Sequence, residues 1–266
     1  MRTVVTLVAV VTLLGLAGCG NARRHAVGKY VDSVNAIQQD MRLPLARVQF
    51  AYRQFGRPGF SSTQERPQLW AAVRSLQQLH DRLVALDAPP DAAALDRDLI
   101  RLTAREASFA REIAMYADYV PRYRRALTPL AASNRQFQKT LRQAHGPAAQ
   151  AVALRAYRAG IVPVIASLER LRPPPLLAPL HTRQLDSLRR ISSLADRLAA
   201  SLARQDVTHI GPLLSAFERA SQSTASLAAQ RAQIAAARAY NRRLYAIRAL
   251  ATRIEKEQAA LNNRLR

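Results

Sequence analysis

Few residues of this sequence have side chains that could carry chemistry, and none of them falls at a spacing that defines a reaction centre. The chain has a single cysteine, Cys19, and five histidines. A helical di-metal site would need two Glu-x-x-His motifs and two further carboxylates, and the sequence contains no Glu-x-x-His. It also lacks a Gly-x-Ser-x-Gly elbow and a glycine-rich phosphate loop. We therefore expect no bound metal, no cofactor and no enzymatic activity.

Positive charge is the strongest remaining signal. The chain has 40 Lys and Arg residues against 18 Asp and Glu, a formal net charge of +22. Between positions 119 and 172, ten basic residues accompany only one acidic residue, Glu169, and residues 211–266 contain ten basic and three acidic residues. Arginine binds phosphate through paired hydrogen bonds and stacks on aromatic rings. These two segments are therefore candidate contacts to a polyanion.

Two clusters within these segments combine arginine with tyrosine. They are Arg122, Arg124 and Arg125 with Tyr119 and Tyr123, and Arg242 and Arg243 with Tyr240 and Tyr245. We take the five arginines as candidate contacts to an anionic surface. The alternative is a solvated helix face on which arginine stems cover apolar neighbours.

The elements that must position these residues are all helical in period. The longest pattern alternates steps of four and three without a slip, which is the pattern of a heptad seam; it consists of Leu95, Leu99, Leu102, Glu106, Phe109, Ile113, Tyr116, Val120, Tyr123, Leu127, Leu130, Asn134, Phe137 and Leu141. Pro121 and Pro129 lie inside this segment and should bend the helix without ending it. Proline and glycine pairs end the other segments. The predicted helices are 26–55, 63–87, 91–144, 148–172, 176–205 and 212–264, with a break in the last near 230–240.

A weak internal duplication accompanies the heptads. A shift of about 85 residues aligns Pro44-Leu45-Ala46 with Pro129-Leu130-Ala131 and Pro89-Pro90 with Pro174-Pro175. The repeat implies units of three helices in which the last helix of one unit continues into the next, a connectivity similar to that of spectrin-like arrays. We predict an all-α, elongated antiparallel bundle with coiled-coil-like packing, built from two to three tandem three-helix units. The alternative is a single compact helical bundle.

The start of the chain has the pattern of an export signal. Arg2 precedes an uncharged apolar run of about eleven residues, which suits a signal peptide and is too short to span a bilayer. The run leads into Leu16-Ala17-Gly18-Cys19, an ending that resembles the lipobox of bacterial lipoproteins. The resemblance implies that residues 1–18 are removed and that Cys19 is lipidated. The alternatives are an uncleaved signal anchor and an ordinary secretory signal followed by a buried cysteine.

The residues after Cys19 bear on where such an anchored protein would stay. Arg23 and Arg24 follow closely, so on this interpretation they lie near lipid headgroups, where each adds about 1 kcal/mol of attraction to an anionic surface. Gly20 occupies the place where the lipoprotein family usually has Asp as its inner-membrane retention signal, which favours an outer membrane where two membranes exist. Behind an export signal, nucleic acid is not an expected partner.

These observations predict a lipid-anchored, extracytoplasmic scaffold or interaction protein of the bacterial cell envelope, held on the cell membrane or outer membrane. Its expected partners are the membrane, through Cys19, and an anionic lipid, an envelope polymer or a second helical protein. The alternative is a lipoprotein whose helical bundle binds a small molecule or metal. The predicted organisation is a signal peptide (1–18), a lipid-anchored linker (19–26), helical repeats at 27–115 and 116–205, and a partial third repeat at 206–266.

Overall fold

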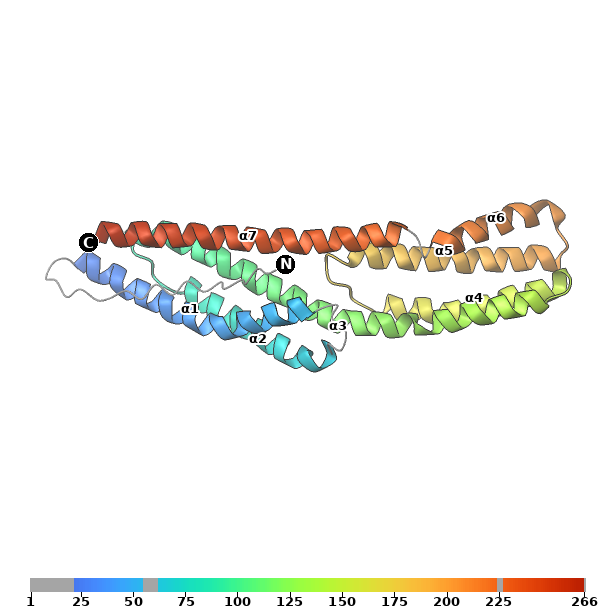
Figure 1. The fold of residues 1–266 in the computed structure, drawn as a ribbon, viewed down its shortest axis with the longest axis horizontal. Helices are drawn as coiled ribbons and strands as arrows, with labels where there is room; N and C mark the ends of the chain where they lie inside the picture. Colours follow the sequence, from blue (N-terminus) through green and yellow to red (C-terminus); the bar gives the residue numbers. More distant parts are fainter. Residues whose placement is uncertain (1–21, 55–61, 224–226, 266) are drawn as a thin grey trace. The chain divides into compact units, whose positions relative to one another are not determined.

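The computed structural model describes residues 22–54, 62–223 and 227–265, and this part of the chain is all helical (Figure 1). It contains seven α-helices, one short 3-10 helix (η1, Pro90–Ala92) and no strand. The α-helices are α1 (Ala22–Gln54), α2 (Ser62–Val84), α3 (Ala93–Gln143), α4 (Pro147–Glu169), α5 (Ala178–Ala203), α6 (Val207–Ser223) and α7 (Leu227–Leu265). The predicted all-α bundle is confirmed.

Two helix boundaries differ from the sequence prediction. α1 begins at Ala22, so residues 22–26, which we assigned to the linker, are already helical. The segment predicted as a helix from residue 212 with a break near 230–240 is α6 and α7: α6 begins at Val207 with Pro212 inside it, and α7 passes through residues 230–240 without a break. Asp206 explains the early start, because its carbonyl accepts the backbone N–H groups of His209 and Ile210 and so opens the helix before the proline. Pro212 lies in the second turn of α6, where its missing N–H removes one hydrogen bond of the helix.

The turn between α5 and α6 is held by a residue with a positive φ angle. Gln205 has φ 54°. The N–H of Asp206 donates to the carbonyl of Ser201 at 2.9 Å, and the N–H of Gln205 donates to that of Leu202 at 3.1 Å. The first of these bonds is the signature of a Schellman motif, which glycine normally closes because it has no Cβ. Gln205 therefore occupies a backbone position that suits glycine better.

α3 passes both of its internal prolines without a break, as predicted. Its seam residues Leu95, Leu99 and Ile113 are buried. The two polar members of the seam are Glu106 and Asn134, and they differ in their surroundings. The Asn134 side chain accepts a hydrogen bond from Tyr157 at 2.8 Å, whereas the Glu106 carboxyl has no such partner among the described residues.

The chain divides into two compact units, residues 1–117 with 241–266 (unit 1) and residues 118–240 (unit 2). The boundary after residue 117 lies close to the predicted boundary between the first two repeats. The segment predicted as a partial third repeat is instead divided between the units. Unit 1 combines α1, α2, the first part of α3 and the last part of α7. Unit 2 combines the rest of α3, α4, α5, α6 and the first part of α7.

The core of unit 2 forms around α4 and α5, which run side by side and antiparallel (Figure 1). Phe137, Tyr157 and Phe217 come from three different helices and form a ring cluster, with the first two stacked at 4.4 Å between ring centres. α3 and α4 approach closely at Gly160, where an added Cβ would lie 2.5 Å from the Ser133 hydroxyl. The contact requires a residue without a side chain.

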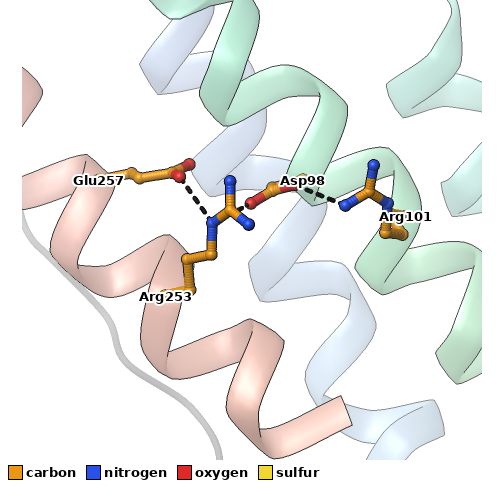
Figure 2. Close-up of polar contacts among 4 residues, drawn as sticks. All are labelled: Asp98, Arg101, Arg253 and Glu257. Carbon is orange, nitrogen blue, oxygen red and sulfur yellow. Dashed lines mark hydrogen bonds and ion pairs between the residues drawn. The ribbon is translucent and has the colours of Figure 1, made fainter. Parts of the chain in front are cut away.

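In unit 1, charged pairs connect α3 to α7 (Figure 2). The Asp98 side chain is buried, and its carboxylate lies 2.8 Å from Nε of Arg253 and 3.2 Å from a guanidinium nitrogen of Arg101. Arg253 also contacts Glu257, one turn further along α7, at 3.0 Å. A buried carboxylate is destabilising unless it is paired. The pair with Arg253 therefore makes the position of α7 on α3 in unit 1 specific.

Candidate functional site

The residues predicted to face an anionic surface do not form one site. Cys19 lies outside the described residues. Arg23 and Arg24 lie in the first turn of α1, and Arg24 is exposed. Arg122, Arg124 and Arg125 belong to unit 2, and Arg242 and Arg243 belong to unit 1.

Two of these candidate arginines are already paired with carboxylates. Arg122 contacts Asp118, one turn before it on α3, at 3.1 Å. Arg243 of α7 forms an ion pair with Glu112 of α3, whose side chain is only 9% exposed. Pairing gives Arg243 a structural role in unit 1, because the buried carboxylate of Glu112 depends on it.

The other candidate arginines on α3 belong to a longer row of free cations. Five exposed cationic side chains lie along the second half of this helix in two groups, and no described residue forms an ion pair with them; they are Arg124 and Arg125, and Arg135, Lys139 and Arg142. No Asp or Glu occurs on α3 after Asp118. At a rise of 1.5 Å per residue the row is about 27 Å long. We refer to these five residues as the α3 basic stripe.

The tyrosines beside the arginines are mostly unavailable for stacking on a ligand. Tyr119 is buried, and its hydroxyl lies 2.9 Å from Nδ1 of His181, which is also buried. Tyr123 stacks on Tyr119 with 5.3 Å between ring centres. Burial raises the pKa of Tyr119 and lowers the pKa of the His181 imidazole. The group is part of the core of unit 2, which agrees with our interpretation of His181 as a packed seam residue.

The second tyrosine cluster is divided in the same way. Tyr240 is buried, whereas Tyr245 is 66% exposed. The guanidinium carbon of Arg248, rather than that of Arg242 or Arg243, lies 5.8 Å from the centre of the Tyr245 ring. Arg242 is exposed and has no ion pair among the described residues.

A cleft in unit 1 brings a buried carboxyl together with apolar side chains and arginines. The cleft has a volume of about 230 Å³ and lies between α1, α3 and α7. Its lining consists of Leu45, Val48, Gln49, Tyr52, Arg53, Glu106, Phe109, Leu244, Ile247 and Arg248. We call it the Glu106 cleft. The heptad seams of the three helices supply the apolar wall, since seam residues point toward the helices opposite.

Glu106 is the unusual member of this lining. It is 7% exposed, and its carboxyl has no hydrogen bond or ion pair among the described residues. Burial raises the pKa of Glu106 to about 8 from the usual value of 4.5, because an apolar environment disfavours the charged form. At neutral pH the group is therefore a neutral acid that can donate one hydrogen bond and accept others.

A second, smaller cavity of about 80 Å³ adjoins the first, and Leu45 and Glu106 line both. Arg42 of α1 lines the smaller cavity, and its Nε atom is buried without a hydrogen bond. The buried, unbonded Nε atom of Arg42 and the Glu106 carboxyl, which has no hydrogen bond to a described residue, thus border the same space. Buried polar groups normally have partners, so this region has unused binding capacity.

Sequence reasoning did not select the Glu106 cleft or the full α3 basic stripe. A signal for each was present. Glu106 is a carboxylate at a heptad seam position, where an apolar residue is expected. Arg135, Lys139 and Arg142 follow one another at steps of four and three, and Arg135 lies on the same side of the helix as Arg124, eleven residues before it.

No cluster of three or more His, Cys, Asp or Glu side chains that could hold a metal ion occurs within residues 22–54, 62–223 and 227–265. In the same part of the chain, α4 is the one helix long and apolar enough to cross a membrane. Its buried face packs in the core of unit 2, which is the behaviour of a core helix.

The fold and these sites define an all-α protein made of helical bundle units, with a basic helix face and one cleft that contains a buried carboxyl. No family model, curated protein or solved structure matches this chain.

Proposed function

We propose that this protein is a lipid-anchored, extracytoplasmic interaction protein of the bacterial cell envelope that binds an anionic lipid surface through the α3 basic stripe. The lipobox-like ending at Cys19 supports the anchor and the localisation. The observation that carries the interaction is the stripe itself, because its five cations are exposed and have no carboxylate partner. We assign no catalytic activity to the chain.

The stripe fits a phosphate-bearing surface for two reasons. Unit 2 contains 18 Arg and Lys residues and six Asp and Glu residues, so its field attracts anions before contact. In addition, each Arg or Lys near an anionic membrane surface contributes about 1 kcal/mol of attraction. Five such residues in one row are enough for stable but salt-sensitive binding, because exposed charges are screened over about 8 to 10 Å at physiological ionic strength.

The test is sedimentation of the chain from Gly20 onward with vesicles that contain phosphatidylglycerol, compared with vesicles of phosphatidylcholine alone. Changing all five stripe residues to Gln should weaken binding to the anionic vesicles by about three to four orders of magnitude at low salt, since five contributions of about 1 kcal/mol are lost. The matched control removes five exposed arginines of unit 2 that lie outside the stripe, namely Arg172, Arg183, Arg190, Arg197 and Arg204. It should retain most of the binding.

Equal loss in the stripe variant and the control would mean that net charge alone drives binding and would refute the stripe. Binding that does not decrease with salt would refute the electrostatic basis. Binding to a purified anionic wall polymer but not to vesicles would assign the stripe to the polymer instead of the lipid.

The anchor is tested separately on the full chain. Mass spectrometry of the membrane-purified protein should show acyl chains on Cys19 at the N-terminus of the mature form. Cys19→Ala, or treatment with globomycin, should leave the precursor unprocessed. An unchanged mass and fractionation in both cases would refute the lipoprotein assignment.

A further inference from the structure

We propose that the Glu106 cleft is a binding site for a long-chain carboxylate. The ligand carboxylate lies at the junction of the two cavities, between the Glu106 carboxyl and the guanidinium groups of Arg42 and Arg248, and its hydrocarbon chain lies on the apolar wall. The inference rests on unit 1 alone and does not depend on the anchor or on the α3 basic stripe.

The junction contains polar groups that have no hydrogen bond to a described residue of the protein. Glu106 is only 7% exposed, and it borders both cavities. The Arg42 Nε atom is buried and unbonded in the smaller cavity. Leaving a polar group buried without a partner costs about 1 to 3 kcal/mol. A ligand group that bonds to both would remove this cost for the Arg42 Nε atom and give the Glu106 carboxyl a partner.

The charged side chains around Glu106 are mostly positive. From α1 the cavities are lined by Arg42, Tyr52 and Arg53, and from α7 by Arg248 and Glu255. α2 contributes no lining residue; its His80 is hydrogen-bonded at 2.7 Å to Thr103 of α3, which lines the smaller cavity. Glu255 is exposed. Three arginines and two glutamates therefore line the two cavities together, and Glu106 is neutral at neutral pH. The net positive charge attracts an anion and repels an ammonium group.

The wall of the larger cavity is mostly apolar. Leu45, Val48, Phe109, Leu244 and Ile247 give the larger cavity an apolar lining. The Tyr52 and Phe109 rings meet edge to face with 5.7 Å between their centres. An apolar lining with a few convergent polar groups is typical of a small-molecule site. An elongated hydrocarbon chain fits this wall, while its polar end meets the junction.

A neutral acid and an ionised ligand carboxylate form a charge-assisted hydrogen bond. Here the Glu106 O–H donates to the ligand carboxylate, and the guanidinium N–H groups donate to the same oxygens. Gln can also donate a hydrogen bond and stays neutral, so it can replace Glu106 for an anionic ligand. It cannot replace a carboxylate that pairs with an amine. The Glu106→Gln variant therefore distinguishes the two ligand classes.

The experiment uses the full chain in phosphatidylcholine vesicles and a photoreactive palmitate analogue whose diazirine is on the hydrocarbon chain. Mass spectrometry should locate the label on peptides that contain the wall residues of α1, α3 and α7. Palmitate should compete with the label, and hexadecylamine should not. Glu106→Gln should label within about twofold of wild type, whereas Glu106→Leu, Arg42→Gln and Arg248→Gln should each weaken binding about tenfold, the effect of losing one hydrogen bond to a charged group.

Arg53→Gln is the matched control, because Arg53 lines only the larger cavity and its guanidinium already donates to the Gln49 side chain at 3.4 Å. It should change affinity by less than about twofold. Thermal melting by circular dichroism should confirm that every variant is folded. A further readout is pH: affinity should fall about tenfold per pH unit above about 8, where Glu106 ionises.

Three outcomes would overturn the proposal. Absence of label in the cleft of the folded wild type would mean that the space holds water only. Competition by hexadecylamine together with loss of binding in Glu106→Gln would assign the site to an amine. Equal effects of Arg53→Gln and Arg42→Gln would show that binding follows overall charge. Vesicle binding through the α3 basic stripe is measured on other variants, so either proposal can fail alone.

Discussion

Replacing Glu106 by Gln should stabilise the protein, and the gain should depend on pH in a defined way. Folded Glu106 keeps its proton up to about pH 8, whereas the unfolded chain releases it near 4.5. Between these values the folded state binds more protons than the unfolded state, so the free energy of unfolding of the wild type falls as pH rises. Above about pH 8 both states are ionised, and the loss is complete.

The size of the effect follows from the pKa difference. A shift of one pKa unit corresponds to 1.36 kcal/mol, so the displacement from 4.5 to about 8 corresponds to about 5 kcal/mol at full ionisation and about 3 kcal/mol at pH 7. Gln cannot ionise. The difference in unfolding free energy between Glu106→Gln and wild type should therefore rise from near zero at about pH 4.5 to its maximum at about pH 8.

The assay is urea unfolding of both proteins at about pH 5, 7 and 8.5, followed by far-ultraviolet circular dichroism. Taking the difference between the two proteins cancels the titration of His181 and of every group they share. Glu255→Gln, a change at an exposed carboxylate on the smaller cavity, is the control and should show no pH-dependent gain. A gain in Glu106→Gln that is constant over this range, or a variant less stable than wild type at pH 8.5, would refute the reasoning.

Three further predictions concern single residues. Gln205→Gly should raise the free energy of unfolding by about 1 kcal/mol, because glycine adopts a positive φ angle without strain; lower stability in urea unfolding would contradict the Schellman assignment. Arg243→Gln should lower the free energy of unfolding by about 2 kcal/mol, since it leaves the buried carboxylate of Glu112 unpaired. Arg242→Gln is the control and should not lower it. Equal melting temperatures of the two variants would contradict the structural role of Arg243. Gly160→Val should lower the free energy of unfolding by about 2 kcal/mol, because the new side chain overpacks against α3. Gly211→Val is the control and should not lose stability through a steric clash, since an added Cβ at Gly211 meets nothing within 4 Å. Equal losses of stability at the two sites would argue against the close approach of α3 and α4 at Gly160.

The helical class and most helix positions were predictable because the signal is local. The seam of α3 repeats every three and four residues, and this periodicity by itself indicates one apolar face over the whole of residues 91–144. The two internal prolines interrupt single hydrogen bonds and leave the face intact. The early start of α6 was missed for a local reason as well: Gly211-Pro212 resembles a helix boundary, whereas Asp206 opens the helix one turn before it.

The candidate sites were less predictable because each depends on what lies opposite a given face. Arg242 and Arg243 are neighbours with the same side chain, and nothing in their spacing indicates that only Arg243 meets a buried carboxylate, since that partner, Glu112, is 131 residues away. Tyr119 looked available beside three arginines, and it is buried against His181. In both cases the partner comes from a distant helix.

By itself, the sequence determined the all-helical class, the heptad seams, the excess of positive charge and the lipobox-like pattern at Cys19, because each follows from residue type and short spacing. Only the tertiary structure decided which arginines remain free, how the segments divide into two units, and that Glu106 faces a cleft between α1, α3 and α7. The physical reason is that helical periodicity defines the apolar face of a helix but does not define the helix that packs against it. Whether a polar seam residue such as Glu106 or Asn134 finds a partner depends on that second helix.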